Sequence, residues 1–101
     1  MITCSIRYTV DPLKLAEFEH YARLWIPLVE KFGGTHHGYF LPHEGASDTA
    51  LALFSFPSLA AYETYREQAA ADPECQAAMA YYAQTRCFER YDRSFMRPVL
   101  G

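Results

Sequence analysis

The spacing of apolar residues along this chain switches between two periods, and this pattern limits the folds that it can form. Residues 2–10 alternate strictly between apolar and polar side chains, which predicts a strand buried on one face. From residue 15 onward, apolar residues recur every three or four positions, which predicts a helix with one buried stripe. The expected stripe is Leu15, Phe18, Ala22, Trp25, Ile26 and Val29.

Local signals mark the ends of this first helix. Asp11-Pro12 is typical of a helix start, because Asp accepts a hydrogen bond from a free amide and Pro has no amide to leave unpaired. Gly33-Gly34 indicates the end, since glycine readily adopts the left-handed conformation that follows many helices. Pro27 lies inside the pattern, and we expect a kink there rather than an end.

The rest of the chain predicts a hairpin, two more helices and a last strand. The hairpin segments are GTHHGYFLPHE, residues 34–44, and TALALFSF, residues 49–56. Ser58 is expected to cap the second helix, and Asp72-Pro73 repeats the helix-start pair before the third. The inner stripe of the second helix is expected to be Leu59, Tyr62, Tyr65 and Ala69. Residues 86–99 form an aromatic, mixed-charge run that predicts the last strand.

This order of elements predicts an α+β fold of the ferredoxin-like βαββαβ type. In that fold, helices cover one face of a four-stranded antiparallel sheet. No linker, repeat or low-complexity segment divides the chain, so we expect residues 1–101 to form a single domain.

Charge and cysteine content argue against several classes of function. The net charge is −3 with nine Lys and Arg residues, so nucleic acid and anionic membrane surfaces are not expected partners. No apolar run approaches the roughly 18 residues that span a bilayer, and nothing marks the N-terminus for secretion, so we expect a cytoplasmic protein. Cys4, Cys75 and Cys87 lack metal-binding or disulfide spacing, and we interpret them as buried, reduced thiols.

The apolar residues of the later strands predict a homodimer. They occupy both alternation classes, so the sheet face without helices would expose them to water unless a second copy covered it. The residues concerned are Tyr39, Phe40, Leu41, Leu51, Leu53, Phe54, Phe56, Phe88, Tyr91, Phe95 and Met96. The alternative is that all these side chains belong to one core. Tyr21, Leu24 and Leu28 lie opposite the stripe of the first helix, where they would extend the association or simply be exposed.

Several short motifs resemble those of the NIPSNAP family. They are Ser5-Ile6-Arg7-Tyr8, Gly33-Gly34 followed by Gly38-Tyr39-Phe40, the stretch from Leu53 to Leu59, and Asp72-Pro73. The resemblance spans essentially the whole chain and implies that two ferredoxin-like sheets pair as a dimeric α/β barrel. Barrels of similar architecture include antibiotic-biosynthesis monooxygenases, haem-degrading monooxygenases and lactone isomerases. NIPSNAP domains have no agreed chemistry, so the fold alone does not decide the function.

Histidine is the first candidate for chemistry. His36 and His37 are neighbours and point to opposite faces of a strand, and His37 is about 20 Å from His43 at ~3.3 Å per residue. We therefore expect no metal site within this strand unless a second subunit completes it. One of His36 and His37 should face the interior of the expected barrel, where an imidazole with a pKa of about 6.5 can carry a proton. Gly38 and Pro42 are able to introduce a bulge that changes which of the two faces inward.

Two functions of different class remain. Arg7, Tyr39 or Phe40, and Arg90 or Arg93 are the candidates for holding a small aromatic or carboxylate ligand in the barrel. With His36 or His37 as a catalytic residue, the alternative is a cofactor-independent monooxygenase or isomerase. We expect no cofactor, because nucleotide-binding, serine-hydrolase and zinc-protease motifs are missing. The opposing interpretation is that these polar groups only pair across the sheet or the interface. The alternating charges of Glu89, Arg90, Asp92 and Arg93 favour such cross-strand or cross-subunit ion pairs.

Overall fold

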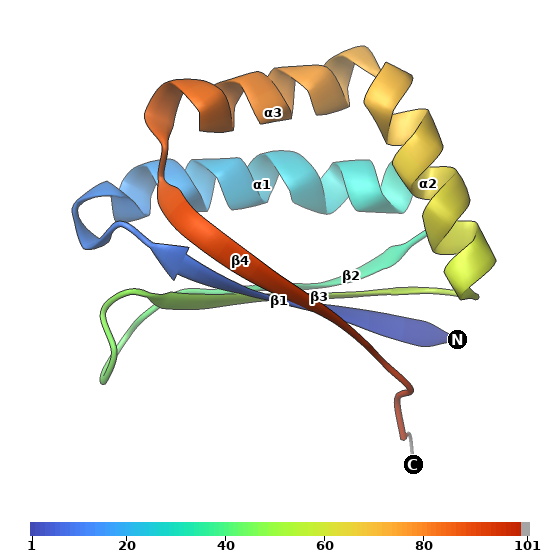
Figure 1. Cartoon of the computed structure of the whole chain (residues 1–101), viewed down its shortest axis with the longest axis horizontal. Helices are drawn as coiled ribbons and strands as arrows, with labels where there is room; N and C mark the ends of the chain where they lie inside the picture. The colour runs from blue at the N-terminus through green and yellow to red at the C-terminus, as the bar shows by residue number, and fades with distance from the viewer. Residues whose placement is uncertain (100–101) are drawn as a thin grey trace.

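The computed structural model describes residues 1–99, and within them the elements follow the predicted order. They are β1 (Ile2–Val10), the 3-10 turn η1 (Pro12–Lys14), α1 (Leu15–Lys31), β2 (Thr35–Phe40), β3 (Thr49–Phe56), α2 (Leu59–Ala71), α3 (Pro73–Thr85) and β4 (Phe88–Met96). The antiparallel sheet has the order β2-β3-β1-β4, and the helices lie on one side of it (Figure 1). The predicted ferredoxin-like fold is confirmed.

The helix starts form as the capping residues predict. The side chains of Asp11, Ser58 and Asp72 each accept a hydrogen bond from a backbone amide two or three residues later, at 2.9 to 3.1 Å. α1 follows a short 3-10 turn and continues through Pro27 to Lys31. None of the helices in residues 1–99 is long and apolar enough to cross a membrane.

One hydrophobic core lies between the sheet and the helices. The buried side chains of β1, which are Cys4, Ile6, Tyr8 and Val10, are at most 7 % exposed. They pack on buried residues of the helices and of β3, so the alternation predicted for the first strand is confirmed. Aromatic side chains buried in such a core together contribute much of the stability of the fold.

Two predictions about helix faces are wrong. Leu28 is buried, and Tyr21 and Leu24 pack against the core rather than extending an outer surface. The reason is that α3 lies beside α1 and covers this side of it (Figure 1). Leu59, expected in the inner stripe of α2, is instead 55 % exposed.

A bulge in β2 decides which way its side chains point. The register with β3 shifts between His36 and Gly38, and Gly38 has φ +111°, a conformation that favours glycine. The ring of His36 stacks on that of Tyr39 with centroids 5.1 Å apart, so both lie on the helix side although they are three residues apart. The bulge that Gly38 suggested is therefore present.

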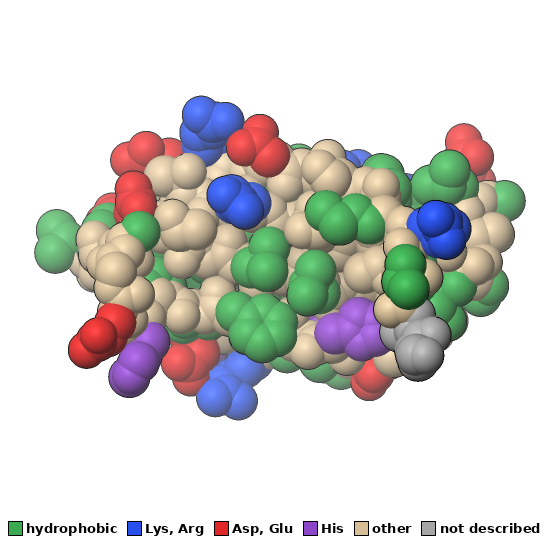
Figure 2. Space-filling view, turned by 90° about the horizontal axis from the view of Figure 1, so that it is seen from below, with side chains coloured by type: hydrophobic (Ala, Val, Ile, Leu, Met, Phe, Trp, Pro, Cys, Tyr) green, Lys and Arg blue, Asp and Glu red, His purple; other side chains and the backbone are tan. Residues whose placement is uncertain are grey.

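The sheet face turned away from the helices, called the open face below, is less apolar than predicted. Phe54, Phe56 and Phe88 are at most 5 % exposed and belong to the core, so the alternative of a single core holds for them. Hydrophobic side chains still gather near the middle of the open face, with a histidine beside them (Figure 2). By strand register the open-face apolar residues are Phe40, Leu51, Leu53 and Met96.

Gly34, between α1 and β2, leaves no room for a side chain. A Cβ atom there would lie 2.7 Å from both Phe56 Cζ and Val29 Cγ1. We expect Gly34→Ala to lower the free energy of unfolding by about 1 to 3 kcal/mol, the usual cost of overpacking a core. Urea denaturation measures this change. The control Gly33→Ala has open space around its Cβ and tests only the backbone cost of φ +94°; an unchanged stability for Gly34→Ala would contradict the packing explanation.

Candidate functional site

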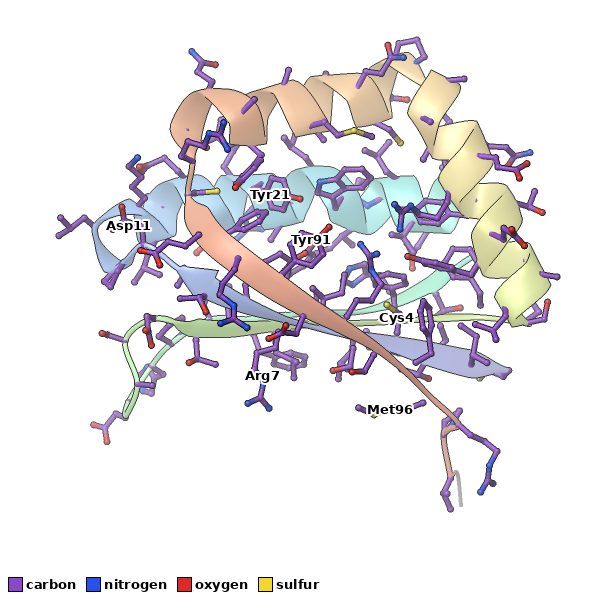
Figure 3. The ribbon with its side chains drawn as sticks, viewed as in Figure 1. Cys4, Arg7, Asp11, Tyr21, Tyr91 and Met96 are labelled. Carbon is purple, nitrogen blue, oxygen red and sulfur yellow. The ribbon has the colours of Figure 1, made fainter. Side chains whose placement is uncertain are left out.

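A cavity of about 200 Å³ lies between the sheet and the helices. Every strand and each of α1, α2 and α3 contributes a side chain to its wall. Figure 3 shows Tyr21 of α1 and Tyr91 of β4 in this layer. The lining residues are Ile6, Tyr8, Tyr21, Trp25, Val29, Tyr39, Phe54, Tyr62, Tyr65, Arg66, Met79, Tyr91 and Arg93. The wall is therefore mostly aromatic, with two cations.

A row of paired residues crosses the sheet at this cavity. Tyr39 of β2 lies opposite Ala52 of β3, Ala52 lies opposite Ile6 of β1, and Ile6 lies opposite Arg93 of β4. Paired residues on neighbouring strands point to the same face, so all four point toward the helices. Of these four residues, Tyr39, Ile6 and Arg93 line the cavity.

Four tyrosines of the cavity wall are held as neutral hydroxyl groups by burial. Burial raises the pKa of Tyr8, Tyr21, Tyr39 and Tyr65 above the ordinary value for a phenol. Neutral hydroxyls donate and accept hydrogen bonds, but they do not balance the charge of a neighbouring cation. The wall thus offers polarity without negative charge.

The two arginines have different partners. The guanidinium of Arg93 lies 5.2 Å from the ring centroid of Tyr91, and its Nε is buried without a hydrogen-bond partner. Arg66 donates a hydrogen bond from Nη1 to the hydroxyl of Tyr62 at 3.0 Å. None of the residues that line the cavity is acidic. The site is therefore positively charged and rich in hydrogen-bond donors.

The structure divides the site residues predicted from the sequence between two faces of the sheet. His36, Tyr39 and Arg93 are on the helix side, and only Tyr39 and Arg93 line the cavity. Figure 3 shows Arg7 pointing away from the helices. The predicted residues on the open face are Arg7, His37, Phe40 and Arg90. No single site can hold all of them.

His36 lies behind the aromatic wall, not in the cavity lining. Its Nδ1 accepts a hydrogen bond from the amide of Gly38 at 2.9 Å, which leaves the proton of the neutral ring on Nε2. That Nε2 is buried without a partner. Burial, aided by the nearby His37, lowers the pKa of His36 to about 4. The ring is therefore neutral at pH 7 and a weak base.

His37 belongs to a small polar network on the open face. Its Nε2 lies 2.8 Å from the hydroxyl of Ser55, and this hydroxyl also lies 2.8 Å from that of Thr3. Ser55 is only 3 % exposed, so the two contacts satisfy a buried polar group. No sequence pattern predicts this contact with Ser55, because it depends on the register between β2 and β3.

The other polar candidates serve structural contacts. Arg90 pairs with Asp92 at 3.1 Å, and both side chains are about two-thirds exposed, so this ion pair runs along β4 and not across strands as predicted. The three cysteines are free and buried, as predicted. Burial raises the pKa of Cys4 to about 11, although Arg93 and Arg66 oppose this shift. Within residues 1–99, no group of three His, Cys, Asp or Glu side chains is placed to hold a metal ion.

Sequence reasoning missed two residues of the cavity. Trp25 is expected in the buried stripe of the first helix, but nothing in the pattern shows that its indole Nε1 is left without a partner. Arg66 looks like an ordinary surface residue of α2, and the only hint of its role is its position one turn after Tyr62 and directly after Tyr65. The positions of both side chains in the cavity wall depend on how the three helices pack on the sheet.

Comparison with known proteins gives the family. Residues 5–100 match the sequence model of NIPSNAP proteins. The chain belongs to the NIPSNAP family. No curated protein matches the sequence closely enough to count as a relative. The NIPSNAP resemblance of the short motifs is thus confirmed over nearly the whole length.

Solved structures of NIPSNAP proteins share this fold. A NIPSNAP family protein of unknown function from Agrobacterium tumefaciens is 18 % identical, with a TM-score of 0.82 over 97 % of this chain and 87 % of that one. An uncharacterised NIPSNAP-like domain protein from Burkholderia xenovorans is 22 % identical, with a TM-score of 0.80 over 97 % and 84 %. A proposed antibiotic biosynthesis monooxygenase from Nitrosomonas europaea is 9 % identical, with a TM-score of 0.75 over 99 % and 100 %. At these identities the likeness concerns the fold alone.

The lowered pKa of His36 makes stability depend on pH. Between about pH 6.5 and pH 4 the unfolded chain takes up a proton at His36 that the folded chain does not. The free energy of unfolding is therefore higher above this pH range and falls as the pH drops through it. We expect the free energy of unfolding to fall by about 1 kcal/mol more in the parent than in His36→Gln between pH 7 and pH 5, after allowance for partial solvent screening. Urea denaturation at both pH values measures this. His43→Gln, in an exposed loop, is the control; equal pH dependence in parent and His36→Gln would contradict the expectation.

Proposed function

We propose that this NIPSNAP protein binds a small aromatic molecule in the cavity between the sheet and the helices. The observation that carries the proposal is a wall of tyrosines around two buried, unpartnered donors, Trp25 Nε1 and Arg93 Nε. Ligand sites typically combine apolar walls with a few polar groups that fix orientation. A cavity of about 150 Å³ can hold benzene, so about 200 Å³ suits one substituted ring.

This proposal places the ligand within one chain rather than in a chamber shared by two sheets. Tyr39 and Arg93, two of the residues expected to hold a ligand, line the cavity together. Arg7 and Phe40 lie on the opposite face of the sheet, away from the cavity. The helix-side cavity therefore keeps the predicted ligand chemistry and changes its location.

We further propose that the open face pairs with a second copy of the chain. Phe40 and Met96 are 51 % and 53 % exposed there, and Leu51 and Leu53 lie between them in the sheet. A face of four strands is broad enough for the ~1,000 Å² or more that a stable dimer buries.

The cellular location that we propose is a reducing compartment such as the cytoplasm. Three buried free thiols support it.

Catalysis without a cofactor, by oxygenation or isomerisation of the bound ring, is the second candidate function. The aromatic wall of the cavity favours it, and the protein from Nitrosomonas europaea is named as a proposed monooxygenase. His36 supports it less, because its low pKa makes it a poor general base at pH 7. Oxygen uptake with hydroquinones and isomerisation of lactones separate the candidates, since a binding protein turns over neither.

Ligand binding is testable because Trp25, the single tryptophan, lines the cavity. We expect p-cresol and hydroquinone to change its fluorescence in a saturable manner, and calorimetry to give matching affinities. Ile6→Phe projects extra bulk into the cavity and is expected to weaken binding at least about tenfold, through loss of well over 1 kcal/mol of contacts. Ile2→Phe, on the same strand but outside the lining, is the matched control. If neither compound saturates, the proposed function fails.

The dimer is testable at Leu53, in the middle of the open face. Burying a glutamate against a second copy costs several kcal/mol unless it is paired. We therefore expect Leu53→Glu to be monomeric in multi-angle light scattering at micromolar concentration, where the parent is dimeric. Leu13→Glu, at a side chain 92 % exposed in η1, should leave the dimer intact. A parent protein that runs as a folded monomer would overturn the proposal.

A further inference from the structure

The cavity holds more hydrogen-bond donors than acceptors. The Nε of Arg93 is buried without a partner in residues 1–99, and the indole Nε1 of Trp25 is buried beside the hydroxyl of Tyr21 without a hydrogen bond of good geometry. Buried polar groups in proteins nearly always have partners, and each unpartnered one needs an explanation. Two such donors in one wall indicate that the missing partner is an acceptor that enters from outside.

The cavity also holds positive charge without a protein counter-ion. Within residues 1–99, the ion pairs join Arg23 to Glu19, Lys31 to Asp72 and Glu74, and Arg90 to Asp92, so neither Arg93 nor Arg66 takes part in one. A guanidinium stays protonated at any physiological pH. Both cations oppose the rise in the pKa of Cys4, so they act on the same region of β1.

The aromatic wall limits what this acceptor can be. The Arg93 guanidinium lies 5.2 Å from the ring centroid of Tyr91, and Arg66 lies 5.9 Å from that of Tyr62, so tyrosine rings flank both cations. Such walls favour a flat apolar body over a strongly hydrated inorganic anion. The volume of about 200 Å³ admits one ring with a short substituent.

We propose that the ligand of this cavity is a small aromatic carboxylate whose carboxylate group binds Arg93. The inference rests on the proposed function and adds the charge of the ligand to it. Arginine forms bidentate hydrogen bonds with carboxylates, and these are among the strongest in proteins. Arg66 adds a second positive charge at the exposed side of the cavity, and the ring lies among the tyrosines with Trp25 Nε1 available to a ring substituent.

Matched acid and amide pairs test the charge directly. Benzoate is compared with benzamide, and phenylacetate with phenylacetamide, by Trp25 fluorescence and by calorimetry. The members of each pair have nearly the same shape, so shape alone predicts equal affinity. We expect each acid to bind at least about tenfold more tightly than its amide, which equals ~1.4 kcal/mol, and to lose this advantage as salt is added.

Variants of the two arginines locate the contact. We expect Arg93→Gln to weaken benzoate binding at least about tenfold while leaving benzamide binding unchanged, and Arg93→Lys to retain part of the preference for the acid. Arg66→Gln should weaken benzoate binding about two- to threefold, because this side chain is exposed and screened. Arg23→Gln, which removes the same charge from the outer side of α1, is the control and should bind both compounds as the parent does.

The outcomes separate this inference from the function on which it rests. If each amide binds the parent as well as its acid, or if folded Arg93→Gln keeps the preference for the acid, the carboxylate proposal is overturned while aromatic binding stands. If the parent binds no acid and no amide but does bind p-cresol, the carboxylate proposal is again overturned. If no aromatic compound binds, both proposals fail. Should Arg93→Gln not fold, Arg93→Lys and the acid and amide pairs still decide the question.

Discussion

Pairing of β1 with β3 on one side and β4 on the other is the interaction on which the rest of the structure depends. The two antiparallel ladders fix Ile6 between Ala52 and Arg93, and through Ala52 they fix Tyr39 as well. A shift of one residue in either ladder would move a whole set of side chains to the opposite face. The cavity wall, the polarity of the open face and the position of the cation all follow from this register.

The aromatic core must pack tightly enough to stabilise the fold, and it also contains a cavity. These two requirements oppose each other. Aromatic rings from the sheet and all three helices pack on one another, for example Tyr8 with Phe18 at 5.1 Å and Phe56 with Tyr65 at 5.0 Å between centroids. The same layer leaves an opening and keeps a guanidinium without a counter-ion. Unpaired charge in a partly buried place is costly, and sites that bear such a cost are often functional. The surrounding rings stabilise the core and form the wall of the cavity.

Sequence periodicity predicted the fold well because its signals are local. The alternation of residues 2–10 and the capping residues Asp11, Ser58 and Asp72 act within a few residues of themselves. The predictions were wrong where the burial of a residue depends on elements that are distant in the sequence. Leu28 is buried because α3, far along the chain, packs on that side of α1. Most rings of the hairpin and last strand belong to the core. Strand register decides which face of the sheet each ring lies on, and composition does not reveal that register.

The candidate site was predictable only in part, for the same reason. Tyr39 and Arg93 were identified by residue type, but a strand pattern interrupted by glycine does not reveal that Arg7 and Phe40 point the other way. Trp25 and Arg66 enter through helix packing, which no spacing rule encodes.

The irregularity at Gly38 matters for comparing this chain with its distant relatives. It gives β2 one extra residue between His36 and Tyr39. A regular alternation of faces counted from one end of the strand therefore assigns the residues beyond the bulge to the wrong face. In a relative with an uninterrupted strand, the position that aligns letter by letter with Tyr39 would face the opposite layer. Equivalent positions across such proteins are therefore defined by superposing backbones, with a one-residue offset after His36, and not by alignment columns.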